Sequence, residues 1–257
     1  MAPKILSIVN SKGGVAKTTS CVNLCAGLSL LGKSVLGVDL DPQANFTHSL
    51  IGDLEEDAAN ITEVILGKAS LKSIIRSTHL KNFDIAPAGE SMVNLDLQLQ
   101  STIGREHKLK QVLSDKFLDK YDFIVIDNSP HVSLKTVNSL VASHAYICPV
   151  SAEYLPLVGI KHLLKIIEEI KPINPEIRNA GFLITMSDKR EGISSDVEKI
   201  LRETFPDEVF KSLIRINTKL KACPQKRMTI FDMEKPSGKG FTDYMCATKE
   251  LLTRVGS

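Results

Sequence analysis

A glycine-rich segment near the N-terminus, Lys12-Gly13-Gly14-Val15-Ala16-Lys17-Thr18-Thr19, constrains the fold of this chain most strongly. An apolar run at residues 4–9 precedes it, and apolar residues at helical spacing follow it. A strand, a glycine-rich loop, a lysine, a hydroxyl and a helix in this order form a cradle for phosphate groups. Backbone N–H groups donate to anionic oxygens, while Lys17 adds a positive charge and Thr18 a hydroxyl ligand for Mg²⁺. The alternative, a chance Gly-Gly turn, is disfavoured by matching elements downstream.

The segment does not match the general P-loop pattern G-x-x-x-x-G-K-[ST], because Ser11 and Ala16 stand where its two glycines would be. The tandem Gly13-Gly14 and the additional Lys12 instead indicate a deviant P-loop. Alanine at position 16 costs about 1–2 kcal/mol if its backbone φ is positive. It is tolerated if the residue already lies in the first helical turn, and the sequence leaves both possibilities open.

Short apolar, β-branched runs alternate with helix-like patterns along the whole chain. Several runs are apolar throughout, which is typical of parallel strands covered on both faces. This order predicts an α/β fold with a doubly wound, mostly parallel sheet flanked by helices on both faces, in a single domain of residues 1–257. Residues 52–80 are the least patterned part and are expected to hold short helices. The expected strands are 4–9, 34–38, 83–87, 122–127, 145–150, 180–186 and 209–216, with helical patterns at 109–117 and 158–170.

Composition excludes several other classes of protein. A net charge of +2 excludes a polycation, and no stretch approaches the roughly 20 apolar residues of a membrane span. The N-terminus enters a strand without a secretory leader, so we expect a cytoplasmic protein. The five cysteines form no C-x-x-C pair. Cys21 and Cys25 share one helix face and are expected to be buried apolar residues rather than metal ligands or a disulfide.

Carboxylates follow two of the expected strands. Asp39 and Asp41 come after the run at 34–38, and Asp127 comes after the run at 123–126. Ligands bind beyond the carboxyl ends of parallel strands, and carboxylates beside a triphosphate need a cation, so Mg²⁺ is implied. Asp39 and Asp41 are two residues apart in extended chain and are expected to face the same way, towards the loop. Asp127 is expected to bind Mg²⁺ through water or to orient Thr18, with a helix-capping role as the alternative.

These segments resemble the ParA/MinD family of P-loop ATPases. Residues 12–19 resemble its deviant P-loop, residues 38–45 its "DLDPQ" switch I element, and residues 123–127 a Walker B element. Residues 127–130 would be switch II, although Asn128-Ser129 replace the family's usual Thr/Pro-type residues. The resemblance implies that residues 12–19 bind ATP, that Thr18, Asp39 and Asp127 serve the Mg²⁺ site, and that Asp41 orients or activates the hydrolytic water. The implied catalytic set is Lys12, Lys17 and Asp41.

The resemblance gives Lys12 a particular role. A lysine on a loop is ordinarily a solvated charge. In the ParA/MinD family this lysine crosses a dimer interface to the partner's nucleotide, so ATP would hold a sandwich homodimer together and hydrolysis would release it. Because the other site residues are all present, we expect ATP binding with slow hydrolysis despite Ala16. The alternative is a variant that binds ATP and hydrolyses it poorly.

A basic stripe runs through residues 211–227, where six basic residues occur and no acidic one: Lys211, Arg215, Lys219, Lys221, Lys226 and Arg227. Lys189 and Arg190 add two more basic residues upstream. A basic segment in a balanced chain indicates a site for a polyanion, although many charge runs are only solvated surface. Aromatic residues are scarce there, so contacts with duplex phosphates fit better than stacking on single strands.

The same region extends the resemblance to essentially the whole chain. Residues 214–224 resemble the family's "IPRNVRLSEAP" segment and residues 186–190 its "MFDART" segment, while residues 236–241 resemble its C-terminal end. Lys219 and Arg190 then fall at DNA-contacting positions, and we add Arg215 and Lys221 from the stripe. Met186 and Pro224 fall at positions that contact the adenine base.

The resemblance therefore implies a nucleoid-associated ATPase for DNA partitioning or cargo positioning. Its ATP-bound dimer would bind double-stranded DNA non-specifically, and a ParB-like adaptor would stimulate hydrolysis. A MinD-type membrane-cycling ATPase is the alternative, but it needs a C-terminal amphipathic basic helix, and residues 249–257 show little apolar face. A metal-cluster carrier or reductase needs paired cysteines, and Cys148 and Cys223 lack that spacing.

Overall fold

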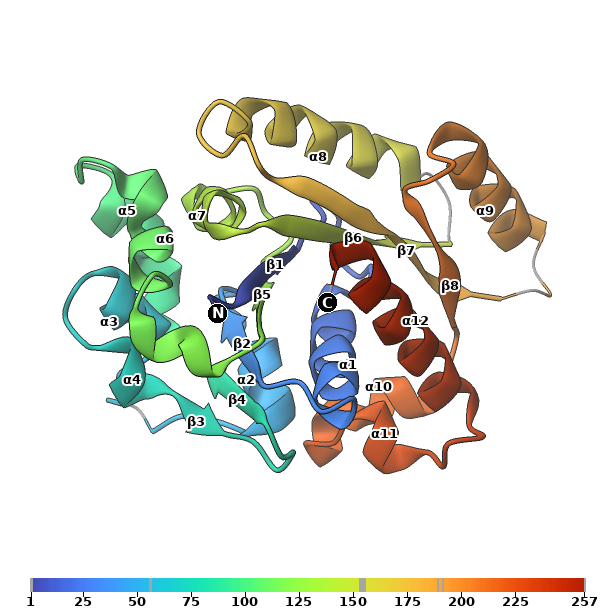
Figure 1. Ribbon diagram of the computed structural model, residues 1–257, viewed down its shortest axis with the longest axis horizontal. Helices are drawn as coiled ribbons and strands as arrows, with labels where there is room; N and C mark the ends of the chain where they lie inside the picture. The colour runs from blue at the N-terminus through green and yellow to red at the C-terminus, as the bar shows by residue number, and fades with distance from the viewer. Residues whose placement is uncertain (1, 56, 153–155, 189, 191, 257) are drawn as a thin grey trace.

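The computed structural model describes residues 2–55, 57–152, 156–188, 190 and 192–256. Within these residues the strands are β1 (Lys4–Ile8), β2 (Val35–Asp39), β3 (Arg76–Ser77), β4 (Phe83–Ala86), β5 (Phe123–Asp127), β6 (Ala145–Ser151), β7 (Arg178–Ser187) and β8 (Val209–Arg215). They form one sheet in the order β3-β4-β2-β5-β1-β6-β7-β8 (Figure 1). Only β3 runs antiparallel to its neighbour β4 among these described strands.

Helices cover both faces of the sheet, which confirms the predicted α/β architecture (Figure 1). One face carries α1 (Lys17–Leu30), α2 (Asn45–Leu50), α10 (Thr218–Lys226), α11 (Ile230–Met233) and α12 (Lys239–Val255). The other face carries α7 (Leu134–Ala142), α8 (Pro156–Ile170) and α9 (Gly192–Thr204) over one half of the sheet. Over its other half lie α3 (Ile61–Ile65), α4 (Leu71–Ile74), α5 (Leu95–Leu99), α6 (Lys108–Val112) and the 3₁₀ helices η1 (Glu90–Asn94), η2 (Arg105–His107) and η3 (Lys116–Lys120).

The strand sequences account for this two-sided burial. Side chains of successive strand residues point to opposite faces. In β5, Phe123 and Val125 pack with the α1 side of the sheet, whereas Ile124 and Ile126 pack with the opposite side. A central strand covered on both faces must therefore be apolar at every position, which is the pattern that predicted it.

Two segments differ from the prediction. The pattern at residues 109–117 is split between α6 and η3, because the side chain of Asp115 accepts a hydrogen bond from the N–H of Phe117 (3.1 Å) and begins a new turn. The short strand β3 was not predicted, since both of its residues are exposed and carry no apolar signal. Residues 52–80 contain the short helices α3 and α4, as expected.

The edge strand β8 is covered by α12. The carboxylate of Glu250 accepts hydrogen bonds from the backbone N–H groups of Lys211 (2.7 Å) and Ser212 (2.9 Å), and Asp243 accepts one from Arg215 (3.0 Å). Burial alone would raise the pKa of Glu250, but these N–H donors and Arg254 outweigh it and lower that pKa. Three backbone N–H groups of this strand are thus bonded to carboxylates of α12.

The apolar face of α12 is part of the core. Tyr244, Ala247 and Leu251 are buried, and Thr248 lies so close to Gly27 of α1 that any Cβ at position 27 would overlap it. The terminal helix therefore has a larger apolar face than its last residues suggested, and that face is already packed against α1. Within the described part of the chain, we find no helix with the length and apolarity needed to cross a bilayer.

Candidate functional site

The N-terminus of α1 lies directly after β1 and the glycine-rich loop. Its N-cap residue, Ala16, is in the left-handed region with φ 62° and ψ 35°, and Gly14 has φ 75°. No described side chain caps this helix, and its first turn contains no acidic residue. By contrast, Asn60 caps α3 and Ser133 caps α7. The first N–H groups of α1 are therefore available to an anion, which the positive end of the helix dipole favours.

The positive φ of Ala16 resolves the question that the sequence left open, and it predicts a stability change. Glycine at position 16 removes a left-handed strain of about 1–2 kcal/mol, partly offset by the greater entropy of glycine in the unfolded chain. We expect Ala16→Gly to raise the melting temperature by roughly 2–4 °C for a net gain near 1 kcal/mol. Ala222→Gly in α10 is the control and should destabilise by about 1 kcal/mol. An unchanged or lower melting temperature for Ala16→Gly would contradict this interpretation.

Side chains that the sequence motifs do not single out hold the loop in place. The Nδ2 of Asn10 donates to the carbonyl of Pro149 in β6 (2.8 Å), and its Oδ1 accepts from the N–H of Lys12 (2.9 Å). The Thr185 hydroxyl in β7 donates to the carbonyl of Val15 (3.1 Å). The loop is thus tied to two strands that lie more than a hundred residues further along the sequence.

The two lysines of the loop lie in different environments. Lys17 is 7% exposed, and its Nζ donates to the carbonyl of Lys12 (2.9 Å). Burial lowers the pKa of Lys17, while the charges of Asp127 and Asp41 oppose that effect. Lys12 is exposed. Lys17 is therefore buried within the site, whereas Lys12 lies at its surface.

Asp127 lies at the end of β5, level with Ile8 on β1 and Asp39 on β2. It is fully buried, and neither carboxylate oxygen has a hydrogen-bond partner that meets normal geometry among the described residues. Burial and then Asp39 raise its pKa well above the ordinary range, whereas the nearby Thr18 hydroxyl and Lys17 act in the opposite direction. Buried, unsatisfied carboxylate oxygens beside a hydroxyl are suitable ligands for a hard cation such as Mg²⁺.

The donor set fits a cation that is shared with a phosphate. Within the described residues, no group of three or more His, Cys, Asp or Glu side chains is arranged to hold a metal alone. Mg²⁺ keeps several waters and commonly takes one or two protein ligands together with phosphate oxygens. Thr18 and Asp127 therefore suit Mg²⁺ bound together with a nucleotide.

Both carboxylate oxygens of Asp39 are hydrogen-bonded to residues that follow β2. Its Oδ2 accepts from the N–H (2.9 Å) and hydroxyl (2.8 Å) of Thr47 in α2, and its Oδ1 accepts from the N–H of Asp41 (3.0 Å). Burial raises its pKa to about 6, although the Thr47 donors oppose the shift. Both oxygens thus shape the loop after β2. Asp41 is 6% exposed, acts electrostatically on Lys17 and Asp127, and accepts a hydrogen bond from Gln43.

Two pockets adjoin the phosphate loop. One, of about 310 Å³, contains Gly14, Ala16 and Met186. The other, of about 250 Å³, contains Thr18 and Pro224. Thr19 and Leu220 line both pockets, so the two expected base contacts, Met186 and Pro224, lie on different sides of these residues. Like Ala16, Met186 has a positive φ (54°), which places backbone strain at the start of α1 and near the end of β7, beside the same pocket.

A larger pocket of about 490 Å³ lies beside α2 and α3. It contains no residue of the phosphate loop. Its carboxylates would repel a nucleotide, so it does not compete with the P-loop as a phosphate site. The acidic side chains that line it are Asp53, Glu55, Asp57, Glu63 and Glu90.

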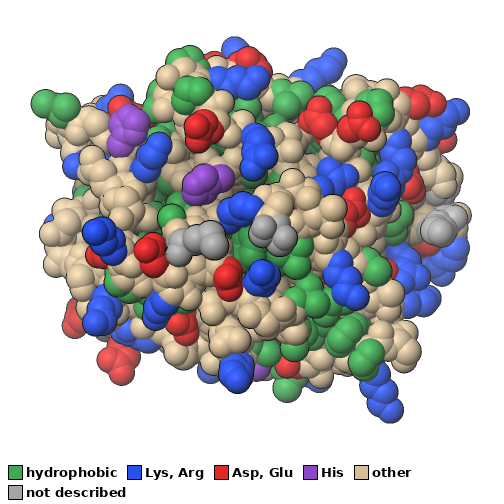
Figure 2. Space-filling model, in the orientation of Figure 1, with side chains coloured by type: hydrophobic (Ala, Val, Ile, Leu, Met, Phe, Trp, Pro, Cys, Tyr) green, Lys and Arg blue, Asp and Glu red, His purple; other side chains and the backbone are tan. Residues whose placement is uncertain are grey.

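Arg215 of the basic stripe lies at the same edge of the sheet as the phosphate loop, because it pairs with Ser187 at the carboxyl ends of β7 and β8. Lys219 and Lys221 are exposed on α10. Arg190 is exposed and forms an ion pair with Asp188, and Lys189 lies outside the described residues. Elsewhere, acidic and basic side chains are interspersed over the face drawn in Figure 2.

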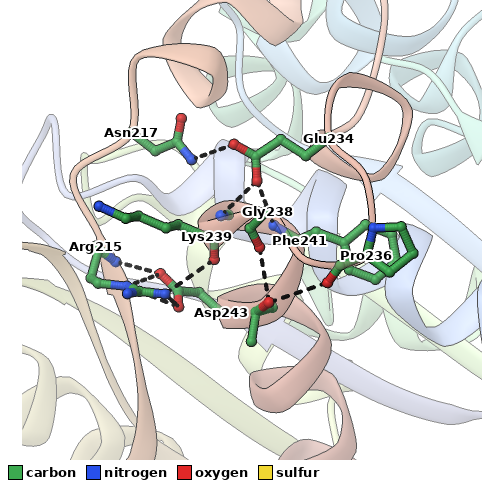
Figure 3. Close-up of polar contacts among 10 residues, drawn as sticks. Arg215, Asn217, Glu234, Pro236, Gly238, Lys239, Phe241 and Asp243 are labelled. Atoms are coloured by element: carbon green, nitrogen blue, oxygen red, sulfur yellow. Dashed lines mark hydrogen bonds and ion pairs between the residues drawn. The ribbon is translucent and has the colours of Figure 1, made fainter.

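Arg215 and the start of α10 are braced by α12, as Figure 3 shows. The guanidinium of Arg215 binds both carboxylate oxygens of Asp243, with distances of 2.6–3.1 Å. The Oδ1 of Asn217 caps α10, and its Nδ2 donates to Glu234 (2.9 Å). Glu234 in turn accepts from the first-turn N–H groups of Gly240 (2.8 Å) and Phe241 (3.0 Å). Arg215 is thus already neutralised by the protein, unlike the exposed lysines of α10.

A doubly wound sheet with a phosphate loop after β1 and carboxylates after β2 and β5 defines a P-loop nucleoside triphosphatase. Residues 3–179 match the AAA domain family AAA_31. The sporulation initiation inhibitor protein Soj from Bacillus subtilis is 35% identical over 96% of this chain and 98% of its own length. The chain belongs to the ParA/MinD family of P-loop ATPases, as predicted.

Other relatives agree with this assignment. The chromosome partitioning protein ParA from Myxococcus xanthus is 31% identical over 98% of this chain and 88% of its own length. The crystal structure of cobyrinic acid a,c-diamide synthase from Mycobacterium smegmatis with bound ADP and magnesium superposes with a TM-score of 0.86 at 29% identity. That superposition covers 99% of this chain and 96% of the other.

Proposed function

We propose that the chain is a DNA-partitioning ATPase that uses ATP and Mg²⁺. The observation that carries the proposal is the pocket shared by the phosphate loop and the basic stripe. Gly14 and Ala16 line one side of it, and Arg215 and Lys221 line another. A nucleotide in this cradle lies beside the residues expected to contact DNA, so binding of ATP can alter their arrangement directly. The magnesium-bound relative and the partitioning relatives support the cofactors and the class of function.

In this proposal each residue of the phosphate site has a separate task. The loop and the first N–H groups of α1 bind phosphate oxygens, and Lys17 exchanges its bond with the Lys12 carbonyl for one with phosphate. Thr18 and Asp127 hold Mg²⁺, which neutralises phosphate charge when bound. Asp41 orients the water that attacks the terminal phosphorus, and Asp39 keeps the Asp41 loop in position. Met186 and Pro224 approach the base from two sides.

Lys12 is proposed to act between two copies of the chain. It is exposed, and Asn10 fixes its backbone at the mouth of the site. A cation held there can reach the nucleotide of a facing subunit, and ATP then joins the two halves of a homodimer. Loss of the terminal phosphate removes that contact and releases the dimer.

The proposed DNA surface consists of Lys219 and Lys221, with Arg190 and Arg215 beside them. It contacts duplex phosphates without reading bases, which gives binding that is non-specific and sensitive to salt. One domain of residues 1–257 therefore carries both sites. In this proposal the protein acts in the cytoplasm on the nucleoid, where a ParB-like adaptor stimulates hydrolysis and release.

A gel shift with random-sequence duplex DNA tests the proposal. We expect a shift with ATP and Mg²⁺ that is lost with ADP and weakens as salt rises. Co-sedimentation with anionic liposomes is the parallel measurement for the MinD-type alternative. Absence of an ATP-dependent shift, or liposome binding in its place, would overturn the DNA-partitioning assignment.

A further inference from the structure

Asn128, the residue after Asp127, makes buried hydrogen bonds to two other elements. It is 1% exposed. Its Nδ2 donates to the carbonyl of Ile8 in β1 (3.1 Å) and to the hydroxyl of Ser139 in α7 (3.0 Å). Its Oδ1 has no hydrogen-bond partner in the part of the chain that the structure describes. One amide thus joins the end of β5 to the strand that leads into the phosphate loop.

Three serines extend this contact into a buried network. The hydroxyl of Ser139 is hydrogen-bonded to that of Ser7 on β1, which also meets the hydroxyl of Ser143 (2.9 Å). Ser143 donates to the carbonyl of Ser139 (2.7 Å). These hydrogen bonds hold α7 against β1 behind the site. Asn128 links this network to the segment that follows Asp127.

The carboxylate of Asp127 depends on its backbone for its direction. The Thr18 hydroxyl acts on this carboxylate, but neither carboxylate oxygen has a hydrogen bond of normal geometry to another described residue. Its carbonyl accepts from the N–H of Leu40 (3.0 Å), which ties it to β2 on one side. Asn128 ties the next residue to β1 on the other side. These two contacts hold the end of β5 between its neighbouring strands.

The chemistry of Asn128 argues against a role in packing alone. A buried amide with an unpaired oxygen costs folding free energy that an apolar side chain of similar size would avoid. Its amide group donates two directional hydrogen bonds, one to the carbonyl of Ile8 and one to the hydroxyl of Ser139. An apolar side chain cannot make either of them. Such attachments behind a metal ligand set that ligand's orientation.

We propose that Asn128 is a positioning residue for the magnesium ion: its bonds to Ile8 and Ser139 fix the chain after Asp127 and so aim the Asp127 carboxylate. The inference rests on the proposed role of Asp127 as a magnesium ligand. It gives a specific task to a residue that departs from the Thr/Pro-type residues usual in the resembling family.

The test measures metal binding without turnover. Mn²⁺ replaces Mg²⁺ as the probe, and free Mn²⁺ is measured by electron paramagnetic resonance on the full chain with ADP. We expect Asn128→Leu, a neutral side chain of similar size, to weaken Mn²⁺ binding about tenfold, with Ser139→Ala weakening it less. ADP affinity without metal should stay unchanged in both variants. If Asn128→Leu fails to fold by thermal melting, Ser139→Ala alone decides.

Two further variants make the outcomes distinct. Ser143→Ala removes a hydroxyl from the same network without touching Asn128, and its Mn²⁺ affinity should equal that of wild type. An equal loss in Ser143→Ala would mean general destabilisation and would overturn the proposal. Asp127→Asn tests the magnesium site itself, and an unchanged Mn²⁺ affinity there would refute the assumed ligand. Weaker binding in Asp127→Asn, with no change in Asn128→Leu and Ser139→Ala, would refute the role of Asn128 alone.

Discussion

Replacement of Asp41 by alanine is expected to slow phosphate release by about a hundredfold to ten-thousandfold while ATP still binds. Asp41 is nearly buried at the end of β2, and its charge acts on both Lys17 and Asp127. In the proposed function it orients the attacking water molecule, and phosphoryl transfer depends mainly on such positioning. The ATP-binding groups, which are the loop N–H groups and Lys17, remain intact in Asp41→Ala.

Asp53→Ala is the matched control for this prediction. Asp53 is an exposed aspartate just beyond α2, and its side chain pairs with His48 at the surface. Its removal should leave both phosphate release and ATP affinity unchanged. Phosphate release is measured at saturating ATP and Mg²⁺, and ATP affinity by equilibrium titration. Asp41→Ala protein that turns over at the wild-type rate would exclude Asp41 from the reaction.

Lys219→Glu is expected to weaken binding to duplex DNA by about tenfold or more and to lower the salt dependence of binding by roughly one charge per subunit. Lys219 is exposed at the start of α10, where its Nζ lies 3.4 Å from the carbonyl of Met233. In Lys219→Glu the new carboxylate would repel the DNA phosphates that the lysine is proposed to attract. ATP affinity should not change, because Lys219 lies in neither pocket beside the phosphate loop.

Lys165→Glu provides the comparison for this charge reversal. Lys165 is exposed on α8, on the face of the sheet opposite α10. The same change of two charge units there should alter DNA affinity only slightly. Equal losses in both variants would mean that net charge, rather than the stripe, governs DNA binding. Loss of both ATP and DNA binding in Lys219→Glu would identify Lys219 as a structural residue.

The main elements of the fold were predictable because their signals are local. Central strands such as β5 are covered on both faces and are therefore apolar at almost every position. A glycine-rich segment before a lysine indicates a phosphate-binding loop between a strand and a helix. β3 carries no such signal, since antiparallel pairing with β4 holds it without burial. Strand pairing uses backbone groups, so the types of these two exposed residues do not record it.

The candidate site was predictable in its residues and less so in their directions. Asp39 and Asp41 were expected to face the same way, and nothing in the sequence indicated that Thr47 of α2 would bind one carboxylate oxygen of Asp39. The contacts of Asn10 and Asn128 were not predictable because their partners, Pro149 and Ile8, lie 139 and 120 residues away in sequence. A polar residue beside a motif indicates an interaction, but only the fold identifies its partner.

The carboxylates that cover β8 bear on how copies of this chain can meet. The unpaired backbone groups of an open edge strand can form hydrogen bonds with a strand of another chain. Pairing of this kind does not depend on a bound nucleotide. Here Glu250 and Asp243 already accept the N–H groups that a second chain would need. Because the pKa of Glu250 lies below its ordinary 4.5, its carboxylate loses its charge only in more acidic solution. At neutral pH these N–H groups of β8 therefore stay bonded within the chain, which disfavours the addition of a strand from a second copy along this edge.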